Sequence, residues 1–87
     1  MNMQIHIPTP LRTYTKKNIV DARGATLTEL FADLDRQFPG IRFRVINEQD
    51  EIREHLKIFV NQNNVADLRA PLQENDRVHI IAAISGG

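Results

Sequence analysis

The sequence predicts an α+β domain in which a mixed β-sheet packs against one main helix. Residues 3–7 and 77–82 show the alternating or continuously apolar patterns of strands, one near each end of the chain. Between them lies one strongly amphipathic segment that begins at Thr26. The chain has 87 residues, which is the size of a single domain. A sheet and one long helix at this length form two layers around one core.

The N-terminal part of the chain predicts a hairpin. Residues 3–7 alternate apolar and polar side chains, which is typical of a half-buried strand. Pro8 and Pro10 end this strand because proline cannot donate a ladder hydrogen bond. Residues 18–22 predict a second strand, followed by a turn at residues 23–25. The connection is short, so we expect the two strands to be antiparallel.

The main helix is predicted to begin after Thr26. Threonine is a good N-cap, and Glu29 stands three residues further on, which completes a capping box. Pro39-Gly40 ends the helix. One face is continuously apolar, and we expect it to bury against the sheet; it consists of Leu27, Leu30, Phe31, Leu34 and Phe38.

The next segment has a weaker pattern. Residues 41–46 suggest a short helical turn or irregular packing, and residues 47–51 read as a polar loop. A strand is predicted to resume near Arg53 and to run to Asn61.

The last third of the chain returns to the sheet. Residues 62–64 predict a turn, because asparagine tolerates the left-handed region. Val65 and Leu68 are expected as buried anchors in a short connecting strand. Residues 71–76 predict a polar turn before the last strand at residues 77–82.

This order of elements predicts a β-grasp, or ubiquitin-like, roll. A hairpin is followed by the helix and then by more strands, and the last strand is expected to lie beside the first. We expect residues 1–84 to form the domain and residues 85–87 to be a flexible C-terminal tail.

The amino-acid composition argues against several classes of function. Eleven basic and eleven acidic residues give a formal net charge of zero, which argues against nucleic-acid binding. No apolar run approaches the roughly 18 residues of a membrane span, and no leader segment is recognised, so we expect a cytoplasmic protein with no membrane contact. The absence of cysteine removes disulfides, thiolate metal sites and cysteine nucleophiles. A chain this small also has little room for an enclosed active site, so we expect no enzyme and no catalytic residues.

The histidines do not predict a metal site. His6, His55 and His79 lack the paired spacing of a zinc motif. His6 and His79 are expected to be neighbours, because both point outward from adjacent strands. We interpret His6 and His79 as imidazoles that face solvent or a partner, and the alternative is a two-histidine metal site.

The sheet face away from the helix predicts a partner-binding surface. With a period of two, Phe59 and Ile81 point outward beside His6 and His79. An exposed apolar patch with a polar rim suggests a partner site, to which we add Ile84. The alternatives are scattered surface side chains or a cover formed by residues 41–52.

The C-terminus is the most informative short motif. The chain ends at Gly86-Gly87, directly after a strand. Glycine has no Cβ and adopts backbone conformations that other residues cannot. A Gly-Gly tail therefore fits a narrow channel in another protein. The α-carboxylate of Gly87 is the one reactive group that this tail presents, and it needs activation, for instance as an acyl-adenylate.

These features resemble the MoaD/ThiS sulfur-carrier family. Phe59-Val60-Asn61 with Val65 is similar to the family's central strand and hairpin. Residues 71–78, with Leu72, Asp76 and Val78, resemble its entry into the last strand, and residues 82–87 resemble its tail. The opening Ile7-Pro8-Thr9-Pro10-Leu11-Arg12 is similar to the branch that feeds cysteine synthesis.

The resemblance implies a sulfur-transfer cycle. An E1-like activating enzyme would use ATP to adenylate Gly87, and sulfur would replace AMP to give a thiocarboxylate. The carrier itself would bind no cofactor. The sulfur acceptor would be a pyridoxal-phosphate cysteine synthase, with the large subunit of molybdopterin synthase or thiazole synthase as alternatives.

Two other functions fit the same sequence. A ubiquitin-like modifier would be activated through the same tail and then conjugated to lysines. A β-grasp interaction module would bind other proteins, and its Gly86-Gly87 terminus would have no function.

Overall fold

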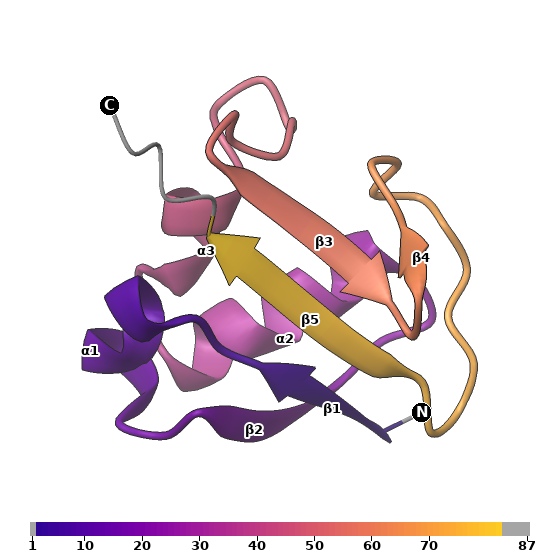
Figure 1. Cartoon of the computed structure of the whole chain (residues 1–87), viewed down its shortest axis with the longest axis horizontal. Coiled ribbons are helices and arrows are strands. Elements are labelled where there is room, and N and C mark those ends of the chain that lie inside the picture. The colour runs from indigo at the N-terminus through magenta and orange to yellow at the C-terminus, as the bar shows by residue number, and fades with distance from the viewer. Residues whose placement is uncertain (1, 83–87) are drawn as a thin grey trace.

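The chain folds into a mixed sheet with one long helix across one face (Figure 1). This computed structural model describes residues 2–82. Within that range the sheet has five strands in the order β2-β1-β5-β3-β4. The strands are β1 (Asn2–His6), β2 (Ile19–Arg23), β3 (Leu56–Val60), β4 (Asn63–Asn64) and β5 (Arg77–Ala82). β1 pairs antiparallel with β2 and parallel with β5, and β5 pairs antiparallel with β3. The predicted hairpin, mixed sheet and neighbouring first and last strands are confirmed.

The connection between β1 and β2 contains two short helical elements that the sequence analysis did not predict. These are the 3₁₀ turn η1 (Thr9–Leu11) and α1 (Arg12–Thr15). Pro10 fits here because the first helical residues need no N–H partner. Leu11 is buried in the core, and the Arg12 Nε donates a hydrogen bond of 3.0 Å to the carbonyl of Ile7. These contacts fold the connection back against the domain.

The main helix, α2 (Leu27–Gln37), begins and ends close to where the sequence predicts. Thr26 Oγ1 accepts a hydrogen bond from the Glu29 N–H at 3.3 Å, as in a capping box. The Glu29 carboxylate accepts in return from the N–H of Ala25, one residue before the cap, at 3.1 Å. The first four members of the apolar stripe are buried, whereas Phe38, at the C-cap, is only partly buried.

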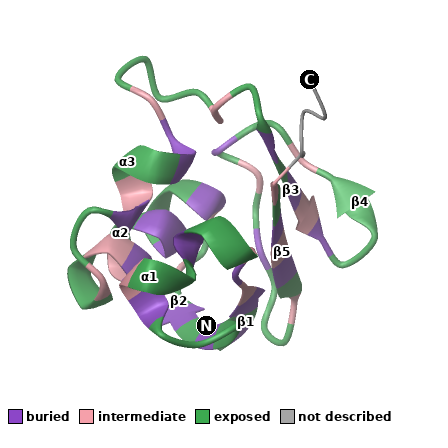
Figure 2. Cartoon of the chain, turned by 60° about the vertical axis from the view of Figure 1, so that its left-hand side comes forward, coloured by how far each residue is buried: buried purple, intermediate pink, exposed green. Residues whose placement is uncertain are grey.

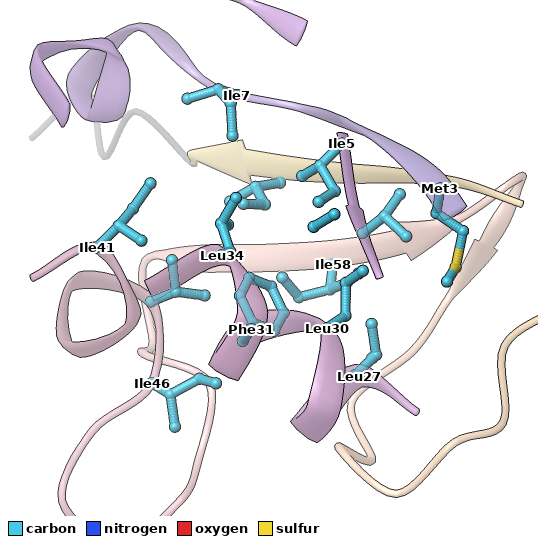
Figure 3. Close-up of a cluster of buried hydrophobic side chains, with 14 of the residues drawn as sticks. Met3, Ile5, Ile7, Leu27, Leu30, Phe31, Leu34, Ile41, Ile46 and Ile58 are labelled. Carbon is cyan, nitrogen blue, oxygen red and sulfur yellow. The ribbon is translucent and has the colours of Figure 1, made fainter. Parts of the chain in front are cut away.

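The core lies between α2 and the sheet (Figure 3). Leu30, Phe31 and Leu34 of α2 point toward Ile5 and Ile58 of the sheet. Figure 2 shows buried residues alternating with more exposed ones along β3 and β5. Residues 41–46 form a short helix, α3 (Ile41–Val45), followed by an extended residue. Its buried members Ile41, Val45 and Ile46 join the same core.

The region after α3 differs from the prediction in three details. β3 begins at Leu56 and not near Arg53, because the Leu56 N–H closes a turn on the carbonyl of Arg53. The predicted turn at residues 62–64 contains β4, and the left-handed residue is Asn61, with φ of 57°.

The third correction concerns the expected connecting strand at Val65 and Leu68, which the structure does not form. Val65 is half-buried and Leu68 is buried. The carbonyl of Leu68 accepts hydrogen bonds from the Thr28 N–H and hydroxyl, both at 2.9 Å. These bonds tie the loop to the first turn of α2 in place of a strand partner.

Within residues 2–82, no helix is long and apolar enough to cross a membrane.

Candidate partner-binding site

One row of outward-facing side chains crosses the whole sheet on the face away from α2. Residues that pair directly across strands share a face, so the register alone defines the row. From one edge to the other it consists of Ile19, His6, His79, Phe59 and Asn64. None of the five is buried. The predicted neighbours His6 and His79 are therefore at the centre of a partly exposed row, and we call this surface the outer face.

His6 and His79 stack at the centre of the outer face. Their ring centroids lie 4.2 Å apart with an interplanar angle of 26°. The Nε2 atom of His6 is buried and has no hydrogen-bond partner within residues 2–82. Burial lowers the pKa of His6, and the nearby charges of His79 and Arg77 lower it further. This arrangement favours a neutral His6.

The stacked geometry is unfavourable for a metal ion shared by the two histidines. No group of three or more histidine and acidic side chains within residues 2–82 is placed to hold a metal ion. A shared metal also needs in-plane nitrogen lone pairs that converge, whereas stacked imidazoles face each other through their ring surfaces.

Apolar groups flank the histidine pair. Ile81 is 45% exposed, and Phe59 is half-buried beside His79. Lys57 lies directly opposite Ile81 and adds a positive charge. The alternative in which residues 41–52 cover this patch is wrong for α3, because α3 packs against α2 on the other side of the sheet.

A groove next to Ile81 leads to the end of β5. It has a volume of about 470 Å³ and is lined by His6, Pro8, Pro10 and Ala82, among others. Ala82 is the last residue that the structure describes. The other predicted site residues, Ile84, Gly86 and Gly87, lie outside the described part of the chain. The groove therefore borders the point from which the tail continues.

A second groove lies at the same end of the molecule, and the sequence analysis did not find it. It has a volume of about 520 Å³, and its lining includes Tyr14, Phe43, Arg44, Arg53 and Ala82. The Arg44 Nε donates a hydrogen bond of 2.7 Å to the Tyr14 hydroxyl, which raises the pKa of Arg44. Tyr14 lies on an unpredicted helix 30 residues away, so the sequence carried no signal of this contact. We call this site the arginine groove.

Comparison with known proteins identifies the class to which this fold belongs. The ThiS family matches the chain over residues 5–87. The sulfur carrier protein CysO of Mycobacterium tuberculosis is 32% identical over 93 residues, covering all of both chains. The crystal structure of the Amycolatopsis orientalis BexX/CysO complex contains a chain that superposes with a TM-score of 0.90 at 31% identity. That match covers 98% of this chain and 99% of the other.

A further structure extends the likeness in fold alone. The small archaeal modifier protein SAMP1 from Haloferax volcanii superposes with a TM-score of 0.84 at 20% identity, with full coverage of both chains. The predicted β-grasp fold is confirmed by these superpositions.

The domain is thus a β-grasp carrier protein, a substrate of other proteins and not an enzyme. The chain belongs to the ThiS family, within the ThiS/MoaD group of sulfur carriers. The family predicted from the Gly-Gly terminus and the strand motifs is confirmed.

Proposed function

We propose that this sulfur carrier is activated at the carboxylate of Gly87 and delivers sulfide to cysteine synthesis. The observation that carries the proposal is the full-length similarity to CysO, combined with a last strand that leads to Gly86-Gly87. Ala82 ends β5 at a rim of the domain, beside two grooves. A second protein that docks at this rim would lie next to the point where the tail begins.

The chemistry has two steps. The Gly87 carboxylate attacks the α-phosphate of ATP on an E1-like activating enzyme, which releases pyrophosphate and forms an acyl-adenylate. Sulfide, or a donor of sulfur at the same oxidation level, then attacks the carbonyl carbon. The C–O bond to AMP breaks, AMP leaves, and a thiocarboxylate remains on Gly87. No redox partner is needed.

The outer face is the proposed binding surface for the activating enzyme. Phe59 and Ile81 supply apolar contact area, and His6 and His79 supply a polar centre. Ile84, which lies outside the described residues, is included in this surface on the sequence alone. Interfaces typically combine apolar anchors with polar side chains, and both kinds stand side by side on this face.

The proposed sulfur acceptor is a pyridoxal-phosphate cysteine synthase. The named relative CysO supports this choice, as does the opening motif of residues 7–12. The large subunit of molybdopterin synthase and thiazole synthase are the alternative acceptors. A gene for one of the three beside that of this carrier would distinguish them.

Mass spectrometry of the intact protein tests the proposal. The carrier is incubated with its co-encoded activating enzyme, ATP and sulfide, and the C-terminal peptide is then sequenced. We expect one oxygen-to-sulfur exchange on Gly87. The matched control lacks Gly86 and Gly87. No exchange on the intact tail would contradict the proposal, and tail peptides joined to lysines of other proteins would instead indicate a ubiquitin-like modifier.

A further inference from the structure

The arginine groove brings two aromatic rings and two guanidinium groups together at one end of the domain. α1, α3 and the end of β5 meet there (Figure 1). The Arg53 guanidinium lies over the Phe43 ring, 4.6 Å from its centroid, and its Nε donates a hydrogen bond of 2.7 Å to the Phe43 carbonyl. Arg44 instead donates to the Tyr14 hydroxyl, so its guanidinium lies at the hydroxyl end of that ring, 6.0 Å from the centroid.

Both guanidinium groups are held by neutral acceptors. Within residues 2–82, the arginines that form ion pairs with carboxylates are Arg36, Arg42 and Arg69. Arg44 and Arg53 use only their Nε atoms in the bonds described above, and each guanidinium has further N–H donors. Each guanidinium group is held by one hydrogen bond and a neighbouring aromatic side chain. This restriction lowers the entropy cost of binding a carboxylate.

Phe43 adds an apolar element to this charged site. It is 51% exposed, more than any other large apolar side chain in the described part of the chain. Arg53 lies over its ring, but about half of the side chain stays exposed, whereas its neighbours Ile41 and Val45 are fully buried. The groove therefore suits an occupant that carries both a carboxylate and an apolar side chain.

The short separation between the groove and Gly87 restricts what this occupant is. Ala82 lines the arginine groove, and Gly87, the residue proposed to be activated, stands five positions after it. Five extended residues reach at most about 18 Å. An enzyme that acts on Gly87 must therefore bring its own surface close to Ala82. The two grooves share Pro10 and Ala82, so the arginine groove continues the proposed partner surface around the root of the tail.

We propose that the arginine groove docks an acidic segment with an apolar side chain on the activating enzyme. Its carboxylates pair with Arg44 and Arg53, and its apolar side chain packs on Phe43. The contact lies on α3 and the following loop, apart from the outer face, and it positions the activating enzyme at the root of the tail. This inference rests on the proposed function, because it assumes an enzyme that takes up the tail.

Calorimetric binding of the carrier to its co-encoded activating enzyme tests the inference. The double variant Arg44→Gln/Arg53→Gln removes both groove charges, and Arg36→Gln/Arg69→Gln removes two exposed charges elsewhere. We expect Kd to rise about tenfold for the groove variant and to stay within about twofold for the control. The dependence of Kd on salt should weaken only in the groove variant, and Phe43→Ala should raise Kd about fivefold. Thermal unfolding of each variant establishes that it is folded.

The outcomes separate the two proposals. If the wild type gains sulfur at Gly87 but the groove and control variants bind equally well, the docking inference is overturned and the sulfur-carrier function stands. If the wild type neither binds the activating enzyme nor gains sulfur, both are overturned. A lysine pair, Arg44→Lys/Arg53→Lys, should recover only part of the affinity, because lysine lacks the planar fork.

Discussion

His6 and His79 lie directly opposite each other on the parallel strands β1 and β5, and their rings stack 4.2 Å apart. Their positions differ by 73 in the sequence, so only the pairing of the first and last strands brings them together. A neutral His6 fits this environment, since its Nε2 is buried without a partner within residues 2–82. The stability of the folded domain should therefore depend on the protonation state of His6.

Acid should destabilise the fold through His6. Its pKa in the folded protein is below the ordinary value of 6.5. Between these two values the unfolded chain binds more protons, so stability falls as the pH drops from 6.5 and levels off below the folded pKa. Urea midpoints at about pH 7.5 and about pH 5.5 measure this loss. His6→Phe keeps a ring against His79 and should lose less stability across the same interval. An equal loss in both proteins would rule out this role for His6.

The helix stripe should dominate the stability of the core. Leu30 and Leu34 have no exposed surface, so Leu30→Ala or Leu34→Ala should lower the free energy of unfolding by about 2–5 kcal/mol each. Arg36→Ala, on the exposed face of the same helix, should change it by less than about 1 kcal/mol. Denaturant titration compares the three. Unchanged midpoints for both leucine variants would contradict helix-on-sheet packing.

Gly24 should tolerate no side chain. A Cβ there would lie 2.4 Å from the backbone nitrogen of Leu30, and backbone in a helix cannot move aside easily. Gly24→Ala should therefore cost about 1–3 kcal/mol. Ala25→Ser, at the exposed neighbouring position, serves as the control and should change stability by less than about 0.5 kcal/mol. If thermal unfolding shows Gly24→Ala to be as stable as the control, the close approach of this turn to α2 is wrong.

The main elements were predictable because each depends on local pattern. The period-two strands, the Thr26 cap and the stripe of α2 all follow from residues a few positions apart. The outward direction of Phe59 and Ile81 followed from the same alternation. Such signals require no knowledge of the tertiary contacts.

The structural features that the sequence did not predict depend on contacts between residues far apart in the chain. α1 has four residues, and it is held by the burial of Leu11 and Thr15, which no local motif announces. The loop at Leu68 takes its hydrogen bonds from Thr28, which replaces the strand that we expected. The arginine groove is lined by four separate segments, so no local sequence pattern could predict it.

Side chains of the outer face near Ala82 should contribute most to the binding of the activating enzyme. Ile81→Ala or Phe59→Ala should weaken binding of the activating enzyme by about 1–2 kcal/mol, because buried apolar anchors dominate interfaces. Arg36→Ala is the control, since Arg36 is exposed on α2, which packs on the opposite face of the sheet. Calorimetry measures the three affinities. Equal losses, or none, would place the interface elsewhere.

The two terminal glycines should be needed for different reasons. In the proposed cycle Gly87 supplies the carbonyl carbon that is adenylated and then attacked by sulfur, so its deletion should abolish formation of the thiocarboxylate. Gly86 is proposed to be needed for passage, because a Cβ restricts φ and ψ inside a narrow channel. Gly86→Ala should therefore slow activation without changing the thermal unfolding midpoint. The rate is followed by pyrophosphate release, and the product by mass spectrometry of the intact protein. Ser85→Ala adds no Cβ and is the control. A Gly86→Ala carrier that is activated as fast as this control would show that the channel does not select for glycine at that position.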